Sequence, residues 1–397
     1  MPGEPLRIAL FSDSTLPILN GVSVSIDALV RELRNQGHSV HVFTAAFPRY
    51  RDPDPNTYRF PAIETPWSKG YPVAPPPYYG MLRKFRRHTF DVIHTHTPGP
   101  IGFVGLRWAQ SHEIPIVATY HTLYDRYAHY IPLLSRRYVR HKIAKHTNFY
   151  YNHVHHVITP SAAAMRWLRR HSVTTPASII PTGAPPPALL GRAEMRAKLG
   201  ISPDQKLLLY VGRLAKEKNL GFLFEACTIA FAQDPALRLW LVGDGPYRAE
   251  TAALARNAGI GDRVVFVGEV KRSEVDPYYA AADLFVFASI SETQGLVVQE
   301  ANTYGLPAVV VGGGGASAGV VSGENGFVVR LETGEFADAV LRVLGDDALY
   351  ARLSEGATRL VRRYGSEAMA EKVVEAYRAA INRVHAEPVK ENRIVLA

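Results

Sequence analysis

AADLFVFASISETQGLVVQE, residues 281–300, predicts a strand, a loop and a helix in direct succession. Asp283–Ala288 is a mainly apolar run, long enough for a buried strand and too short for a core helix. The polar segment Ser289–Gly295 indicates a loop, and the helix expected from Leu296 onward ends at Gly305. A strand that leads through a loop into a helix is the repeating unit of doubly wound α/β domains.

The start of this helix predicts an anion-binding site. The backbone N–H groups of Gln294, Gly295 and Leu296 lie where the helix dipole is positive and intrahelical partners are lacking. Glu292 precedes this point and Glu300 lies about one turn inside the helix. Carboxylates repel phosphate but accept hydrogen bonds from hydroxyl groups, so a nucleotide-sugar fits the pattern. On spacing alone, solvated surface carboxylates remain the simpler interpretation.

The composition indicates a soluble protein of two domains. A length of 397 residues allows each domain to bury a core, and 47% hydrophobic with 20% charged residues is typical of globular proteins. No apolar run is long enough to span a bilayer, and Met1–Arg7 does not resemble a secretory signal. The single cysteine, Cys227, excludes an internal disulfide and a cysteine-ligated zinc site, which fits a cytosolic setting.

Positive charge is concentrated in the first half of the chain. Residues 1–190 contain 21 Lys and Arg against 10 Asp and Glu, whereas the remainder contains 24 against 26. The same half holds 14 of the 15 histidines. One half of the protein is therefore expected to face an anionic partner.

The first 45 residues predict the opening of an α/β domain. Leu6–Asp13 predicts a strand, and the helix after Asn20–Ser23 has apolar side chains at helical spacing before Gly37 ends it. Val40–Thr44 predicts the next strand. Gly21 would let its loop approach a ligand, although a glycine needed only for the turn fits equally well. The G-x-G-x-x-G pattern is absent, so no dinucleotide fingerprint is inferred.

Histidines follow two further predicted strands. Residues 47–80 are rich in Pro and Tyr without periodicity, which indicates an irregular connection. His94 and His96 are expected to point to opposite faces if the strand continues, so we expect loop or core residues rather than a shared metal site. His121 lies where a strand should stop, the position from which α/β folds present reactive groups.

Three basic stretches with interleaved apolar residues lie in this half: Arg83–Arg87, Arg136–Lys145 and Arg166–Arg170. Any one of them is most simply a solvated helix face. Three in one domain suggest that this domain binds an anionic partner surface. The middle stretch places five basic residues beside Tyr138, Val139 and Ile143, a pattern suited to the plane of a membrane interface. These are Arg136, Arg137, Arg140, Lys142 and Lys145.

A second α/β domain is predicted after the Pro-rich linker 184–187. Leu207–Arg213 predicts a strand, and Arg213 and Lys218 emerge near its carboxyl end, where two cations could clamp a diphosphate. Surface salt bridges explain this pair equally well. Further strand–turn patterns follow, and one of them ends in the four glycines Gly312–Gly315.

The motifs occur in the order found in the retaining GT-B glycosyltransferases of family 4, which the chain resembles over nearly its whole length. Within that family, Glu292–Leu296 and Tyr120–Tyr130 are most similar to the bacterial diacylglycerol glucosyltransferases. The sequence departs from the family pattern at Ala316–Val320, where an acidic residue usually follows the glycines. The motifs that carry the resemblance are Asn20-Gly21-Val22, His121, Gly212-Arg213 with Lys218, Gly243-Asp-Gly-Pro, and Glu292 with Glu300.

The resemblance implies an α/β architecture of two doubly wound, Rossmann-like domains facing a central cleft. It implies an acceptor- and membrane-facing domain at 1–184, a donor domain at 185–370, and a helix and tail at 371–397 that return to the first domain. Gly21 would let its loop approach the reacting centre, and His121 would contact sugar or acceptor there.

For the donor, the resemblance implies that Arg213 and Lys218 hold the diphosphate. Glu300 would bind the ribose, Glu292 the hydroxyls of the transferred sugar, and the main chain near Val270 the base. The expected catalytic set is therefore His121, Glu292, Arg213 and Lys218.

The expected reaction is the retaining transfer of a hexose, glucose from UDP-glucose, to a lipid such as diacylglycerol. No Asp or Glu stands out as a nucleophile opposite His121, so we expect front-face attack assisted by the leaving phosphate. No D-x-D motif lies at a predicted strand end and no cluster has metal-ligand spacing, so neither a metal nor another cofactor is expected.

Two alternatives stay open. A GDP-mannose-dependent or other nucleotide-sugar-dependent enzyme would act on phosphatidylinositol or a soluble glycan. A non-catalytic nucleic-acid-binding protein would use the basic half, but it leaves Glu292, Glu300 and the glycine loops without a purpose. With a lipid acceptor, the protein is expected on the cytoplasmic leaflet, bound peripherally through anionic lipid and without nucleic acid. The sequence predicts no oligomeric state.

Overall fold

The computed structural model describes residues 4–18, 20–65, 70–123, 135–183, 187–188, 190–363 and 365–386. The chain divides into two compact units. Unit 1 comprises residues 1–182 and 366–397, and unit 2 comprises residues 183–365. The chain therefore leaves unit 1 near residue 182 and re-enters it near residue 366.

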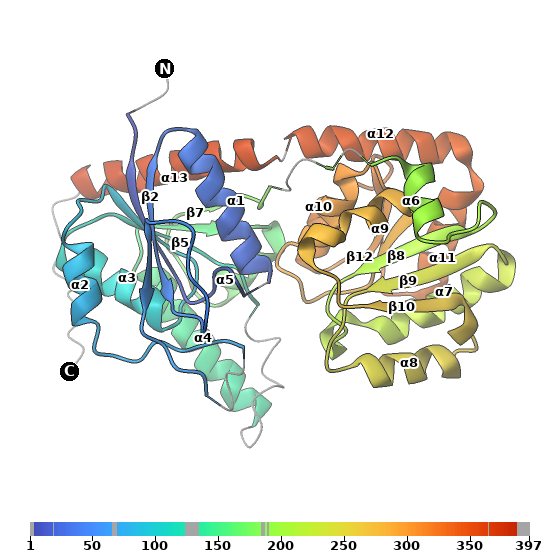
Figure 1. Ribbon diagram of the computed structural model, residues 1–397, viewed down its shortest axis with the longest axis horizontal. Coiled ribbons are helices and arrows are strands. Elements are labelled where there is room, and N and C mark those ends of the chain that lie inside the picture. Colours follow the sequence, from blue (N-terminus) through green and yellow to red (C-terminus); the bar gives the residue numbers. More distant parts are fainter. Residues whose placement is uncertain are drawn as a thin grey trace. The chain divides into compact units, whose positions relative to one another are not determined.

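Unit 1 is built on a seven-stranded parallel sheet of order β3-β2-β1-β4-β5-β6-β7, with helices on both faces (Figure 1). The order reverses between β1 and β4, and ligands of doubly wound sheets bind at such a switch point. The strands are β1 Arg7–Ser12, β2 Ser39–Ala45, β3 Thr57–Phe60, β4 Val92–Thr95, β5 Ile116–Thr119, β6 His156–Thr159 and β7 Ala177–Ile179. The helices are α1 Gly21–Asn35, α2 Tyr79–Phe85, α3 Pro100–Ser111, α4 Arg136–Asn152, α5 Ala162–Arg170 and α13 Ser366–Ala386.

The two faces of this sheet bury alternate side chains of the same strands. In β1, Ile8 and Leu10 join the core beneath α1 and α13, whereas Phe11 joins the core beneath α2 and α3. The second core is aromatic, and the ring of Phe11 stacks on that of Phe43 at 4.7 Å between centroids. The apolar side of α1 that the spacing predicts is buried in the first core.

The C-terminal helix α13 packs on the N-terminal elements, among them α1, β5 and β6 (Figure 1). Tyr377 of this helix is fully buried in the same core as Ile8 and Leu33. Unit 1 is thus completed by a segment nearly 200 residues away from the rest of it in the sequence.

The segment 47–80 contains more regular structure than its sequence predicts. The short strand β3 pairs in parallel with β2 at the edge of the sheet, and α2 begins at Tyr79. Phe60 is the one residue of β3 that is fully buried, so neither an apolar run nor an alternation reveals the strand.

Unit 2 is built on a six-stranded parallel sheet of order β10-β9-β8-β11-β12-β13. Here the order reverses between β8 and β11, and the stretch 281–300 supplies β11 and the following helix α10. The strands are β8 Lys206–Val211, β9 Leu237–Val242, β10 Val264–Gly268, β11 Leu284–Phe287, β12 Ala308–Val311 and β13 Gly326–Val329. The helices are α6 Arg192–Lys198, α7 Leu220–Gln233, α8 Arg248–Asn257, α9 Asp276–Ala281, α10 Leu296–Thr303, α11 Thr333–Gly345 and α12 Asp347–Arg363.

Both units are therefore doubly wound α/β structures, which confirms the predicted fold class. The described part of unit 2 also contains the short 3₁₀ turns η2 Lys216–Lys218, η3 Gly261–Arg263, η4 Arg272–Glu274 and η5 Gly315–Gly319.

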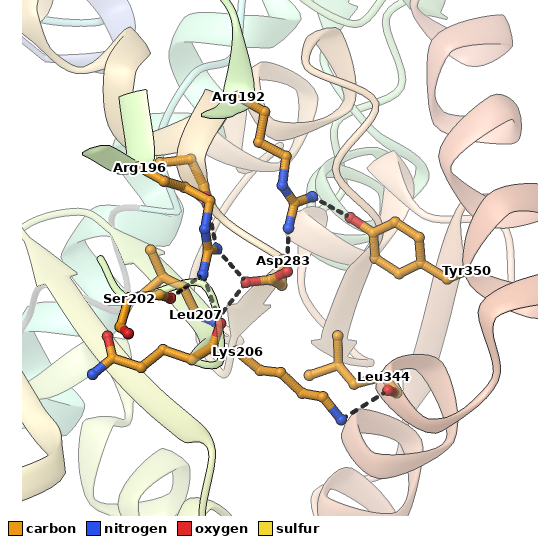
Figure 2. Close-up of polar contacts among 10 residues, drawn as sticks. Arg192, Arg196, Ser202, Lys206, Leu207, Asp283, Leu344 and Tyr350 are labelled. Atoms are coloured by element: carbon orange, nitrogen blue, oxygen red, sulfur yellow. Dashed lines mark hydrogen bonds and ion pairs between the residues drawn. The ribbon is translucent and has the colours of Figure 1, made fainter. Parts of the chain in front are cut away.

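Asp283, which precedes β11, fixes the amino edge of the unit 2 sheet (Figure 2). Its carboxylate accepts a hydrogen bond from the backbone N–H of Leu207 at 2.7 Å and from Arg196 of α6 at 2.9 Å. Arg192 pairs with the other carboxylate oxygen and also donates to the Tyr350 hydroxyl. These contacts hold the amino edge, whereas open α/β sheets bind ligands at the opposite, carboxyl edge.

Candidate functional site

Three loops of unit 2 meet at the carboxyl edge of its sheet, next to the switch point between β8 and β11. They follow β8, β11 and β12 and span residues 212–219, 288–295 and 312–320. This edge is where open α/β sheets bind ligands.

Glycines let the second and third of these loops pack backbone against backbone. Gly295 has φ +72°, and a Cβ there would lie 2.8 Å from the Cα of Ala316. A Cβ on Gly315 would lie 1.9 Å from the carbonyl oxygen of Thr293. The N–H of Gly315 donates to the carbonyl oxygen of Glu292 at 2.7 Å. The glycine run thus fixes the loop that carries Glu292 and the start of α10.

Lys218 and Glu292 form an ion pair inside this loop cluster. Nζ of Lys218 contacts Oε1 of Glu292, and their side chains are only 12% and 20% exposed. The Ser289 hydroxyl donates to the same carboxylate oxygen at 3.2 Å. A candidate phosphate-binding cation and a candidate hydroxyl-binding carboxylate are therefore direct neighbours.

Arg213 lies on the loop after β8 and is half-exposed. Its Nη2 contacts Oε1 of Glu217 at 2.7 Å. Burial raises the pKa of the Glu217 carboxyl, but backbone hydrogen bonding and the charge of Arg213 outweigh it, so this pKa lies below its usual value. The carbonyl oxygen of Glu217 also accepts from the Ser291 hydroxyl at 3.2 Å, which links the β8 loop to the Glu292 loop.

Glu300 lies one turn inside α10, as the spacing predicts, and is held by two residues that sequence reasoning missed. The Tyr279 hydroxyl donates to its Oε2 at 2.8 Å, and Nη2 of Arg272 contacts its Oε1 at 3.0 Å. Burial and the neighbouring Glu300 raise the pKa of Tyr279 well above its usual value. The position of Arg272, two residues after the expected base contact at Val270, is the sequence signal for it.

The other donor-site residues lie along the same edge. Gln294 is buried, whereas Gly295 and Leu296 open α10 and Val270 is partly buried just after β10. All of the predicted donor-site residues except Gly21 thus belong to unit 2 and follow its strands.

His121 lies in unit 1, two residues after β5, and contacts a histidine that follows the neighbouring strand β4. Nε2 of His121 and Nδ1 of His96 are 2.9 Å apart. Burial lowers the pKa of His121 to about 4 and holds that of His96 well below its usual value. Both imidazoles are therefore neutral at pH 7.

His94 is buried in the sheet beside this pair, and the expectation that His94 and His96 face opposite sides is wrong. Their ring centroids are 4.0 Å apart, because side chains two residues apart in an extended chain point to the same face. The nitrogens of His94 contact the Tyr377 hydroxyl and the Thr119 hydroxyl, each at 2.7 Å. Among the described residues no group of His, Cys, Asp and Glu could hold a metal ion.

Gly21 is the exposed first residue of α1, at the carboxyl edge of the unit 1 sheet. The preceding Asn20 caps the helix by accepting hydrogen bonds from the N–H groups of Val22 and Ser23, each at 3.0 Å. Asp13, which the sequence did not single out, follows β1 and accepts from the N–H of Ile101 at the start of α3 at 3.0 Å.

The basic stretches form helices whose interleaved apolar residues are mostly buried. Phe85 of α2, Val139 of α4 and Trp167 of α5 all face the protein interior. For the middle stretch this is a correction, since Val139 was expected to lie at the membrane interface. In α4, Tyr138 and Phe149 remain exposed at 49% and 37%. Arg137, Arg140, Lys142 and Lys145 are exposed, and the side chain of Arg136 lies outside the described part of the structure.

No described helix has the combination of length and apolar character needed to cross a membrane.

Comparison with known proteins identifies the class of this architecture. Its fold is similar to a structure of sucrose-phosphate synthase from Thermosynechococcus elongatus, with a TM-score of 0.75 and 25% identity over 96% of this chain and 100% of that one. A UDP complex of HepE from Anabaena matches with a TM-score of 0.74 and 20% identity over 94% of this chain and 100% of that one. The two units define a GT-B fold.

Sequence relatives identify the family. The model of Glycosyltransferase Family 4 matches residues 19–186, and that of Glycosyl transferases group 1 matches residues 191–360. Alpha-monoglucosyldiacylglycerol synthase of Streptococcus pneumoniae is 34% identical over 321 residues, 77% of this chain and 71% of the relative. The enzyme of that name from Acholeplasma laidlawii is 30% identical over 392 residues, 95% of this chain and 98% of the relative. The chain belongs to the glycosyltransferases of family 4.

Proposed function

We propose that this glycosyltransferase moves glucose from UDP-glucose to diacylglycerol with retention of the anomeric configuration. The observation that carries the proposal is the arrangement around α10, where Lys218, Glu292 and the positive helix end lie within one loop cluster. The two relatives named for monoglucosyldiacylglycerol support the choice of sugar and acceptor.

In the proposed mechanism, donor binding exchanges the partners of an ion pair. The diphosphate replaces Glu292 beside Lys218, and a hydroxyl of the hexose replaces Lys218 beside Glu292. Arg213 and the N–H groups of Gln294, Gly295 and Leu296 add to the binding of phosphate, because donors at a helix start favour an anion. The charges of Lys218 and Arg213 then stabilise the diphosphate as it leaves.

The remaining roles follow the positions of the side chains. Glu300, oriented by Tyr279 and Arg272, binds the ribose hydroxyls, and the main chain near Val270 meets the base. In unit 1, His121 contacts the sugar or the acceptor, and the exposed Gly21 lets the start of α1 approach the reacting centre. No carboxylate nucleophile is proposed, so the leaving phosphate assists attack from the same face.

The experiment that tests this proposal is a matrix of donors and acceptors. Purified protein is incubated with UDP-glucose, UDP-galactose or GDP-mannose, each with diacylglycerol or phosphatidylinositol in mixed micelles. We expect glucosyl transfer to diacylglycerol, with an α-linked product by NMR. A β-linked product would exclude retention, and transfer from GDP-mannose alone would replace the proposed donor.

Transfer from GDP-mannose is also supported by a sequence relative. A GDP-mannose-dependent alpha-mannosyltransferase of Mycobacterium tuberculosis is 30% identical over 375 residues, 87% of this chain and 90% of the relative. The candidate function is then mannosyl transfer to phosphatidylinositol or a soluble glycan.

Catalysis is proposed to need no metal ion, since Lys218 and Arg213 supply the positive charge that a divalent cation would otherwise bring to the diphosphate. We expect full activity in excess EDTA. Loss of activity in EDTA that Mg²⁺ or Mn²⁺ restores would contradict this assignment.

The protein is proposed to reach its lipid acceptor by binding peripherally to the cytoplasmic leaflet. Arg137, Arg140, Lys142 and Lys145 form an exposed basic face on α4, and each contributes about 1 kcal/mol near anionic lipid. Because Val139 is buried, the attraction is expected to be mainly electrostatic, with Tyr138 as an interfacial aromatic residue.

Co-sedimentation with liposomes tests this surface. Changing the four basic residues of α4 to Ser should abolish the salt-sensitive binding to vesicles that contain phosphatidylglycerol. The matched control removes four exposed basic residues of unit 2: Lys198, Arg256, Arg330 and Arg359. Equal binding to neutral and anionic vesicles, or equal loss in the control, would contradict the electrostatic account.

A further inference from the structure

The contact between His96 and His121 has a preferred direction, and that direction decides what His121 can do in the reaction. We propose that Nδ1–H of His96 donates to Nε2 of His121, so that His121 carries its own proton on Nδ1 and acts as a hydrogen-bond donor. His96 is then a positioning residue. The inference rests on the proposed function for the identity of the reaction, but not for the tautomer.

The backbone fixes both rings at the ends of adjacent parallel strands. The N–H of His96 donates to the carbonyl oxygen of Phe11 at 2.9 Å, which extends the pairing of β4 with β1. The residue before His121, Tyr120, donates its N–H to the carbonyl oxygen of Ile158 at 2.8 Å. The separation of 2.9 Å between the two nitrogens is therefore built into the sheet.

Only one proton can lie between two neutral imidazole nitrogens. A neutral imidazole has one N–H donor and one acceptor nitrogen, so the shared proton fixes where the second proton of each ring lies. Burial keeps both rings neutral. If His121 donated through Nε2, then His96 would accept through Nδ1 and carry its own proton on Nε2.

The Nε2 atom of His96 gives the direction. It is buried and has no hydrogen-bond partner among the described residues, and the side chain is 1% exposed. A buried polar atom without a partner costs free energy in either state, but orphaned N–H donors are rarer in protein interiors than under-satisfied acceptors. The adjacent His94 is not a hydrogen-bond partner for this atom, because Tyr377 and Thr119 contact both nitrogens of His94. The proton therefore belongs on Nδ1 of His96.

The chemical consequence is that Nε2 of His121 is engaged as an acceptor and does not serve as a general base. In this tautomer the hydrogen-bond donor of His121 is Nδ1–H, the kind of group from which an oxygen of the transferred sugar or of the acceptor accepts a hydrogen bond. A donor role agrees with a reaction in which the leaving phosphate, rather than a side chain, takes the proton of the attacking hydroxyl.

The direct test is an NMR measurement of the full chain labelled with ¹⁵N-histidine and free of substrate. Long-range ¹H–¹⁵N correlations distinguish the two neutral tautomers, and the signals of His96 and His121 are assigned by their loss in H96N and H121Q. We expect the Nδ1–H pattern for both residues in the wild-type protein at pH 7. An Nε2–H pattern for His121 overturns the proposal.

Two variants separate positioning from packing. In H96N the side-chain amide N–H takes the place of Nδ1–H, so His121 should keep its tautomer and kcat should stay within about threefold of wild type. In H96F the ring is retained without a donor, so the Nδ1–H pattern of His121 should be lost and kcat should fall on the order of tenfold. An unchanged His121 spectrum in H96F would overturn the proposal.

The two proposals fail in different ways. A protein without transferase activity on UDP-glucose but with the expected tautomers would contradict the proposed function alone. An active enzyme with Nε2–H on His121 would contradict the tautomer alone. If H96F does not fold, the wild-type and H96N spectra decide the question.

Discussion

At the scale of single residues, the ion pair between Lys218 and Glu292 shows how the site is held before a donor arrives. Each side chain satisfies the other, so neither is a buried charge without a partner. In the proposed mechanism the diphosphate and the hexose enter by exchange of partners, at a smaller cost than the desolvation of two isolated charges.

The exchange predicts a specific kinetic defect in Lys218→Ala. If Lys218 stabilises charge that develops on the leaving diphosphate, as proposed, kcat should fall on the order of 10²–10³-fold with a smaller change in the KM for the donor. Steady-state kinetics with UDP-glucose measure both. Lys216→Ala, which removes an exposed charge from the same turn η2, is the matched control and should be close to wild type. A variant of Lys218 that raises only KM would leave it as a binding residue.

Sequence reasoning identified the charged residues of this edge but not which side chains each of them contacts. Arg213, Lys218, Glu292 and Glu300 stand out because they follow apolar runs or sit at a helix start. Their partners come from elements that are distant in the sequence, as when Arg272 of η4 meets Glu300 of α10. Proximity of this kind depends on strand order, which a single sequence does not fix.

At the scale of elements, the start of α10 depends on a backbone conformation that other residues rarely adopt. In Gly295→Ala the new Cβ would meet Ala316 at 2.8 Å while the residue keeps φ near +72°. We expect unit 2 to lose about 1–3 kcal/mol in free energy of unfolding, measured by urea denaturation. Gly334→Ala in α11 is the control, since a Cβ at this position would enter open space. Equal stability of the two variants would contradict the strained-turn account.

The elements also show which sequence patterns were informative. Continuous apolar runs such as Leu284–Phe287 predicted buried strands, because both faces of a parallel sheet are covered. The half-buried edge strand β3 had no such run and was missed. The basic helices α2, α4 and α5 were predicted, but the sequence alone did not show that their apolar residues face inward.

At the scale of the whole molecule, histidine is distributed so unevenly that the two units should respond to acid in different pH windows. Unit 2, residues 183–365, contains no histidine at all. Unit 1 buries His94, His96 and His121 with lowered pKa values, about 3 for His94 and about 4 for His121.

The sign of the effect follows from the proton balance. Below the unfolded pKa of about 6.5, the histidines of the unfolded chain bind protons that folded unit 1 excludes. The free energy of unfolding of unit 1 therefore decreases as the pH is lowered from about 6.5 to about 4. One such histidine contributes a slope of about 1.4 kcal/mol per pH unit. In unit 2, burial raises the pKa of Asp234, but hydrogen bonds from Lys206 and a backbone N–H outweigh this effect. The pKa of Asp234 therefore lies below its usual value. The stability that the ionised Asp234 contributes to unit 2 is lost only below about pH 4.

Hydrogen exchange read by mass spectrometry at pH 7 and pH 5 would follow each unit separately, after correction for the intrinsic exchange rates. We expect faster global exchange at pH 5 in peptides of unit 1 and little change in those of unit 2. Equal acceleration in both units would show that the buried histidines do not control acid stability.

The return of α13 to unit 1 has a consequence for how the protein is made on the ribosome. Unit 2 is one contiguous segment, so all of it has been synthesised once residue 365 has emerged. Unit 1 still lacks Tyr377 and the rest of α13 at that moment, and with them one wall of its core. The half that is translated first is therefore the last to close. A message cut short before α13 would release a finished unit 2 joined to an open unit 1, an easy substrate for cellular proteases.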